Sequence, residues 1–116
     1  MRDNSERLAD ILEAIERIRR HISSKSRADF DDDELLQSAV LRWIEIIGEA
    51  ARGLTDQVRD DHPDVPWREI IGMRNRVTHG YFDIDRDVVW NTVTRDLPEL
   101  EAAIRRIHGS SPPGVS

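Results

Sequence analysis

Cysteine is absent from this chain of 116 residues, so disulfides, thiol catalysis and cysteine-ligated metal sites are excluded. Aromatic residues make up only 5% of the sequence, and no apolar run approaches the roughly 20 residues needed to cross a bilayer. The first seven residues, 1–7, lack the apolar stretch of a secretion signal. These absences predict a cytoplasmic protein that is neither exported nor inserted into a membrane.

An excess of basic charge is also missing. The 17 lysines and arginines are outnumbered by 23 acidic residues, which gives a formal net charge of -6. Such a chain repels a polyanion as a whole, so any contact with RNA or DNA must be local. The length suits one domain, and 38% apolar with 34% charged residues favours amphipathic helices.

Apolar residues recur at helical spacing in two long segments. The first helix is expected over 8–22, and the second begins near Asp31 and runs to Leu54. We expect Asp31 to cap the amide of Glu34, with Phe30 packing onto Leu35. Gly48 inside this helix predicts the close approach of a neighbouring helix, and Ile46, which points away from the main stripe, is a candidate contact for a second chain.

Two further helices follow a polar segment, 55–65, that has room for a turn or two of helix before Pro63. A third helix is expected from Pro66 to His79, and a fourth from Asp85 or Asp87 to Ile107, kinked at Pro98. The sequence therefore predicts an all-α fold, an antiparallel up-and-down bundle of four main helices plus a short connecting helix. Residues 1–109 would form the single domain, and 110–116 a disordered tail.

The end of the third predicted helix, residues 73–82, gathers cations in an otherwise acidic chain. Arg74 supplies a permanent planar cation that can bind phosphate through two parallel hydrogen bonds. His79 is the side-chain type suited to moving protons near neutral pH. Metal-free RNA cleavage needs a base for the 2'-hydroxyl, an acid for the leaving 5'-oxygen and positive charge near the phosphorus. One histidine cannot easily be base and acid at once.

Helix geometry limits how these residues can meet. On a regular helix, a step of five residues turns the side chain by about 140° and advances it by about 7.5 Å, so Arg74 and His79 do not share a face. Asn75 and His79, four residues apart, do share one. Either the helix unwinds before His79, or a second chain completes the site. We favour the second alternative, because a two-fold dimer would bring two histidines and two arginines into one cleft.

A purely structural role accounts for the same residues. An arginine and a histidine near a helix C-terminus can bond the last carbonyl groups and complement the helix dipole, and Tyr81 can be a half-buried aromatic. On spacing alone, this structural role is the better interpretation.

The order Arg74, four residues, His79, one residue, Tyr81 resembles the motif of HEPN-domain ribonucleases. The surrounding sequence is similar to the HepT subfamily of HEPN/MNT toxin–antitoxin pairs. The resemblance spans nearly the whole chain, because it includes the motif and the flanking segments Arg7–Leu12, Ile46–Ala51, Pro66–Asn75, Val89–Trp90 and Asp96–Pro98.

This resemblance implies a homodimeric endoribonuclease, the toxin of a toxin–antitoxin pair, that cleaves RNA without metal. Arg74 would hold the phosphate, His79 would move protons and Asn75 would orient either partner. Tyr81 would accept AMP groups from a cognate minimal nucleotidyltransferase (MNT), the antitoxin, and this modification would block substrate by occupancy and repulsion.

Two other functions fit less of the sequence. A non-catalytic HEPN partner that only binds a nucleotidyltransferase, or is modified by it, is favoured by the acidic net charge. A helical interaction module unrelated to nucleotides is the third alternative, and the motif argues against it.

Overall fold

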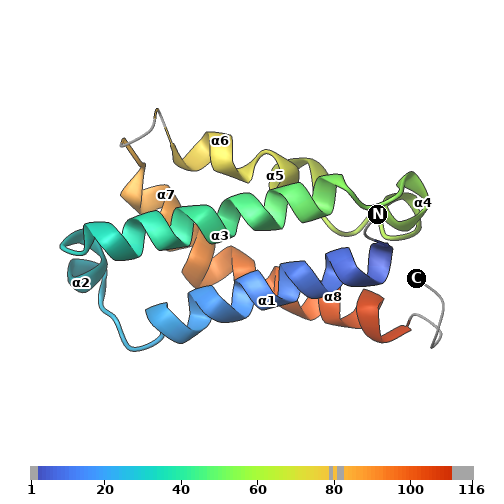
Figure 1. Cartoon of the computed structure of the whole chain (residues 1–116), viewed down its shortest axis with the longest axis horizontal. Coiled ribbons are helices and arrows are strands. Elements are labelled where there is room, and N and C mark those ends of the chain that lie inside the picture. Colours follow the sequence, from blue (N-terminus) through green and yellow to red (C-terminus); the bar gives the residue numbers. More distant parts are fainter. Residues whose placement is uncertain (1–2, 79, 81–82, 111–116) are drawn as a thin grey trace.

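The computed structural model describes residues 3–78, 80 and 83–110, and these form an elongated helical bundle of 44 × 27 × 26 Å (Figure 1). Four rods run antiparallel, and the only β feature among the described residues is an isolated bridge between Thr78 and Ile84. The elements are α1 (Asn4–Ile22), α2 (Arg27–Asp31), α3 (Glu34–Arg52), α4 (Asp56–Asp61), α5 (Trp67–Ile71), α6 (Met73–Val77), α7 (Arg86–Asn91), the π-helix η1 (Thr92–Asp96) and α8 (Leu97–Ser110).

Helix α3 is the central rod. Figure 1 shows α5 and α6 running along one side of it and α1 and α8 along the other. The apolar stripes predicted from spacing face one another here, with Ile11 and Ile18 of α1 and Ile44 and Ile47 of α3 at most 1% exposed. Burial of these stripes drives the association of the rods. The predicted all-α bundle is thus confirmed, with two short connecting helices, α2 and α4, instead of one.

The predicted start of α3 is wrong in detail. Asp33, not Asp31, caps the helix by accepting a hydrogen bond from the amide of Leu36 at 2.9 Å. Phe30 belongs to α2, where it is fully buried, whereas Leu35 is 82% exposed, so the expected packing of Phe30 onto Leu35 does not form. Ser26 and Asp29 make the reciprocal capping bonds at the start of α2 instead.

The third rod is shorter than predicted and is broken. It consists of α5 and α6, five residues each, separated by Gly72. Helix α6 ends at Val77, and Thr78 is extended, with φ -136° and ψ 143°. The helix therefore unwinds before position 79, the alternative that we did not favour. The premise that a regular helix separates Arg74 from His79 is wrong.

Gly48 fulfils the prediction made for it. A Cβ atom at this position would lie 3.2 Å from the carbonyl oxygen of Ile71 and 3.3 Å from that of Ile70. Such contacts are tighter than side chains normally make, so only glycine lets α5 approach α3 this closely. The close approach positions α5, and through it α6, against the central rod.

The fourth rod begins as predicted, because Asp85 caps α7 by accepting a hydrogen bond from Val88 N at 3.1 Å. Pro98 lacks an amide hydrogen and crowds the carbonyl of Thr94, four residues earlier. The chain widens into the π-helix η1 just before it, and Leu97 N bonds the carbonyl of Thr92. The rod continues through α8 to Ser110, and residues 111–116 of the predicted tail lie outside the described residues. None of the described helices has the length and apolar character to cross a membrane.

Candidate active site

Helix α6 carries two of the four predicted site residues. Arg74 is partly buried and Asn75 is exposed. Both line a hollow that α6 forms with α3 and that is open to solvent. His79 and Tyr81 lie outside the described residues, so their predicted roles stay predictions. Arg74 and Asn75 are brought together at one hollow between α3 and α6.

Arg74 is held by an acidic residue of the central rod. Its Nε atom lies 2.7 Å from Oε2 of Glu45, and the two side chains are 42% and 28% exposed respectively. The Nε atom itself is shielded from solvent, and no hydrogen bond is aligned with its N–H among the described residues, so the contact is chiefly electrostatic. Sequence reasoning missed Glu45, because the two residues are 29 positions apart and only the packing of α6 on α3 joins them.

The hollow between α3 and α6 has a volume of about 340 Å³. Its walls pair acidic with basic groups, and Gly48 lies among them. The lining residues are Glu45, Gly48, Glu49, Arg52, Ile71, Arg74 and Asn75. Two guanidinium groups and an amide beside one opening can contact a phosphodiester.

The chain that follows α6 is anchored at both ends. Gly80 N donates to Thr78 Oγ1 at 3.2 Å, and the Thr78 hydroxyl also bonds the carbonyl of Gly80. Thr78 pairs with Ile84 in the isolated bridge, and Asp85 N donates to the carbonyl of Val77 at 2.8 Å. The segment that contains His79 and Tyr81 in sequence therefore starts and finishes at fixed points beside the end of α6.

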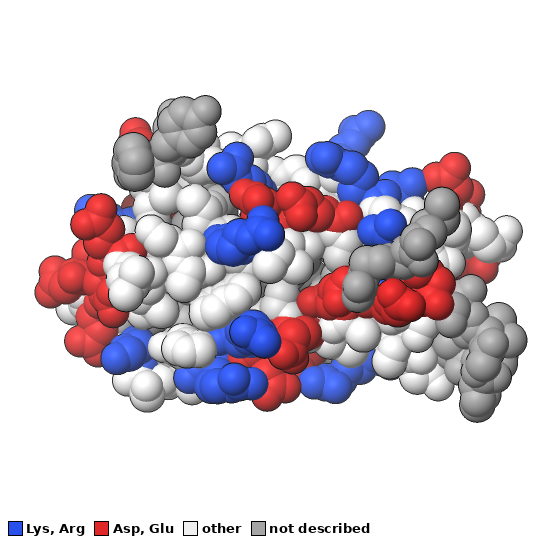
Figure 2. Space-filling model, in the orientation of Figure 1, with Lys and Arg blue, Asp and Glu red and all other residues white. Residues whose placement is uncertain are grey.

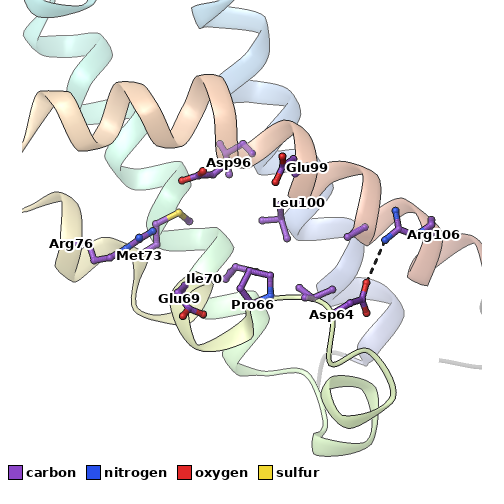
Figure 3. Close-up of a pocket in the computed structure, with 13 residues that line it drawn as sticks. Asp64, Pro66, Glu69, Ile70, Met73, Arg76, Asp96, Glu99, Leu100 and Arg106 are labelled. Carbon is purple, nitrogen blue, oxygen red and sulfur yellow. Dashed lines mark ion pairs between the residues drawn. The ribbon is translucent and has the colours of Figure 1, made fainter.

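A second hollow, of about 400 Å³, lies between α5–α6 and α8 (Figure 3). Its floor is apolar, with Ile70 and Leu100, and Arg106 reaches Asp64 at 3.6 Å across its rim. The rim holds four carboxylates against two guanidinium groups: Asp64, Glu69, Asp96 and Glu99 against Arg76 and Arg106. This acidic rim repels phosphate, so the second hollow is a poor place for RNA.

The surface gives no broad basic platform on the face drawn in Figure 2, where lysines and arginines alternate with acidic side chains. This distribution matches the net charge of -6. Contact with a nucleic acid through non-specific attraction would be weak. A nucleic acid that bound this face would have to be held by a few arginines at one place.

Comparison with known proteins identifies the family of this chain. A family model described as "Ribonuclease HepT-like" matches residues 11–107, which includes α3, α5, α6 and the segment after them. The chain belongs to the HepT-like ribonuclease family. As a HepT-like protein it is similar over nearly its full length to a Thermococcus cleftensis protein named "Probable ribonuclease HepT", with 39% identity over 91% of this chain and 96% of that one.

Other HepT-like relatives carry RNase names as well. A candidate RNase of Caldanaerobacter subterraneus is 38% identical over 86% of this chain and 89% of its own, and a candidate RNase of Methanocaldococcus jannaschii is 35% identical over 89% and 94%. No solved structure is significantly similar to this chain. The resemblance to the HepT subfamily inferred from the motif is thus confirmed at the level of the family.

Proposed function

We propose that this HepT-like protein is the toxin of a toxin–antitoxin pair, a metal-independent endoribonuclease that cleaves RNA at a homodimer cleft with Arg74 and His79. The observation that carries the proposal is the Arg74 guanidinium, held partly exposed at the α3–α6 hollow five residues before a histidine, in a member of a ribonuclease family. The protein would encounter its RNA substrate and its nucleotidyltransferase partner in the cytoplasm.

The chemistry assigns one role to each residue. His79 of one protomer takes the proton of the 2'-hydroxyl, whose oxygen attacks the phosphorus and displaces the 5'-oxygen. A second imidazole gives a proton to that leaving oxygen, so the products are a cyclic phosphate and a free 5'-hydroxyl. Arg74 stabilises the charge on the phosphate oxygens, and Asn75 orients the phosphate or the imidazole.

A homodimer follows from this division of labour. The motif provides one histidine per chain, whereas the reaction needs a base and an acid at the same time. Two copies related by a two-fold axis supply both. The position of Arg74 and Asn75 at the surface supports this arrangement, because a second chain can reach them.

Regulation by the partner is proposed at Tyr81. The tyrosine oxygen, on losing its proton to solvent, would attack the α-phosphate of ATP in the active site of the cognate MNT antitoxin, releasing pyrophosphate and leaving AMP esterified to that oxygen. The added phosphate repels RNA and its bulk occupies the cleft. Mass spectrometry of protein incubated with the partner and ATP tests this step: wild type gains the mass of AMP groups, and Tyr81→Phe does not.

The decisive experiment is cleavage of a labelled RNA in the presence of a chelator. Arg74→Ala and His79→Ala should each lower the cleavage rate by about 10²-fold or more while the variants stay folded and dimeric. Arg76→Ala is the matched control, because Arg76 is exposed on the same short helix but lines the other hollow. Cleavage by both site variants at the wild-type rate would overturn the assignment.

The second candidate is a non-catalytic HEPN partner subunit, favoured by the net charge of -6 and the alternating surface charges (Figure 2). In that case no variant and no wild-type sample cuts RNA, with or without chelator. Tyr81 would still be modified, or the protein would still bind the nucleotidyltransferase. The two experiments above, run side by side, separate the candidates.

A further inference from the structure

The contact between α3 and Arg74 gives the α3–α6 hollow a defined inner wall. Glu45 uses its two carboxylate oxygens differently: Oε2 lies 2.7 Å from Arg74 Nε, and Oε1 accepts a hydrogen bond from Arg42 Nη1 at 2.6 Å. Arg42 is three residues earlier on the same helix. The carboxylate is therefore oriented from within α3 before it meets Arg74.

The two partners sit on elements of very different rigidity. Glu45 is flanked by Ile44 and Ile47, both fully buried, on a helix of 19 residues. Arg74 is on a helix of only five residues, too short to be stable without tertiary contacts. Glu45 therefore fixes the position and orientation of the Arg74 side chain, and Arg74 does not fix those of Glu45.

The shielding of Nε decides which edge of the guanidinium is free. Because Nε has no contact with solvent although the Arg74 side chain is 42% exposed, an incoming ligand can reach only the two Nη groups. These groups form the edge that binds a phosphate through two parallel hydrogen bonds. A guanidinium fixed at Nε loses less conformational freedom when it binds the phosphate.

We propose that Glu45 is a positioning residue that holds Arg74 by its Nε side, so that the Nη edge faces the scissile phosphate. The inference rests on the proposed ribonuclease function and adds a residue to that site. Glu45 itself does not touch the substrate. Its effect is exerted through the orientation of the Arg74 side chain.

Charge and orientation predict opposite effects of neutralising Glu45. If the carboxylate acted only through its field, its removal would strengthen the attraction for RNA and lower KM without lowering kcat. If it orients Arg74, its removal lowers kcat, because misplacing a group that stabilises the transition state can cost up to about 10²-fold. Glu49 is the matched control, one turn further along α3 on the same hollow.

The experiment measures kcat and KM for cleavage of one labelled RNA by full-length wild type and by three variants. Glu45→Ala should lower kcat by about tenfold or more, with KM unchanged or lower. Glu45→Gln should retain part of kcat, since it keeps the shape of the side chain and an amide oxygen beside Nε. Glu49→Gln should leave kcat at the wild-type level or above. Equal kcat values for Glu45→Ala and Glu49→Gln would overturn the inference.

A measurement without RNA separates this inference from the proposed function. In the ¹⁵N–¹H spectrum of the arginine side chains, the Arg74 Nε–H signal should exchange slowly with water in wild type and in Glu49→Gln, and rapidly in Glu45→Ala. Rapid exchange in wild type would overturn the positioning contact even if RNA is cut. A protected signal in a protein that cuts no RNA would overturn the proposed function while leaving the contact intact.

Discussion

Two regions of this bundle are built on different principles. Helices α1 and α3 are 19 residues long each and bury continuous apolar stripes against one another, whereas α5 and α6 are five residues each and lead into an extended residue, Thr78. The long pair holds its geometry by burial. The short pair takes its geometry from α3, through the close approach at Gly48 and the ion pair at Glu45. The candidate site therefore lies in the region, α5 and α6, whose helices are too short to be stable without their contacts to α3.

The comparison predicts that substitutions in the long pair act on stability first. Ile44→Ala should lower the free energy of unfolding by about 2–5 kcal/mol, because Ile44 is fully buried between the rods and its truncation leaves a cavity. Leu35→Ala, in the same helix but 82% exposed, should change it by less than about 0.5 kcal/mol. Urea unfolding followed by circular dichroism measures both, and equal losses would contradict the described core.

The long pair is also the part that sequence alone predicts well. A stripe such as Ile11, Ile15 and Ile18 repeats at helical spacing, so its burial can be deduced without coordinates. The start of α3 cannot be deduced in the same way, because Asp31 and Asp33 are both good caps and local sequence does not say which one the packing of Phe30 selects.

The short pair could be predicted only in part. Arg74 and Asn75 stand out through the family motif, and Gly48 through its cost inside a helix. The early end of α6 could not be deduced, because it depends on the bridge between Thr78 and Ile84, six residues later. The Arg74–Glu45 contact is likewise a product of tertiary packing with no spacing rule behind it.

The contact between the two regions at Gly48 should be sensitive to the volume of the side chain at that position. Gly48→Val places a side chain against the carbonyls of Ile70 and Ile71, so α5 must move away from α3 at a cost of about 1–3 kcal/mol. RNA cleavage should fall as well, because α6 follows α5. Gly109→Val is the matched control, since nothing lies within 4 Å of a Cβ there. The prediction fails if both valines lower the unfolding free energy equally.

The contribution of Glu101 to the free energy of unfolding should depend on pH. Burial raises the pKa of Glu101, but hydrogen bonds from Arg105 and Arg19 outweigh it and hold the pKa below its usual value. Because the folded-state pKa is lowered, the stabilisation is present above the unfolded pKa, about 4.3, and is lost as pH falls through the folded value.

Glu101→Gln should therefore lower the free energy of unfolding by about 1 kcal/mol at pH 7, with little effect once the carboxyl group is protonated in both states. Urea unfolding of wild type and variant at neutral and acidic pH measures the difference. Cleavage of RNA at pH 7 should be unchanged, because Glu101 joins α8 to α1, away from the α3–α6 hollow. A stability difference that grows on acidification would show that the sign is wrong.

Among the substitutions that should also slow RNA cleavage, Thr78→Val is expected to lower the free energy of unfolding the least. Thr78→Val removes the hydroxyl that bonds Gly80 and keeps the branched shape, so the free energy of unfolding should fall by at most about 1 kcal/mol. Cleavage should fall about tenfold, because the start of the segment containing His79 is no longer fixed by that hydroxyl. Thr78→Ser restores the hydroxyl and should restore most of the rate. If the Thr78→Val and Thr78→Ser variants cut RNA equally fast, the hydroxyl has no part in the site. The site then depends on the contact of α6 with α3 alone.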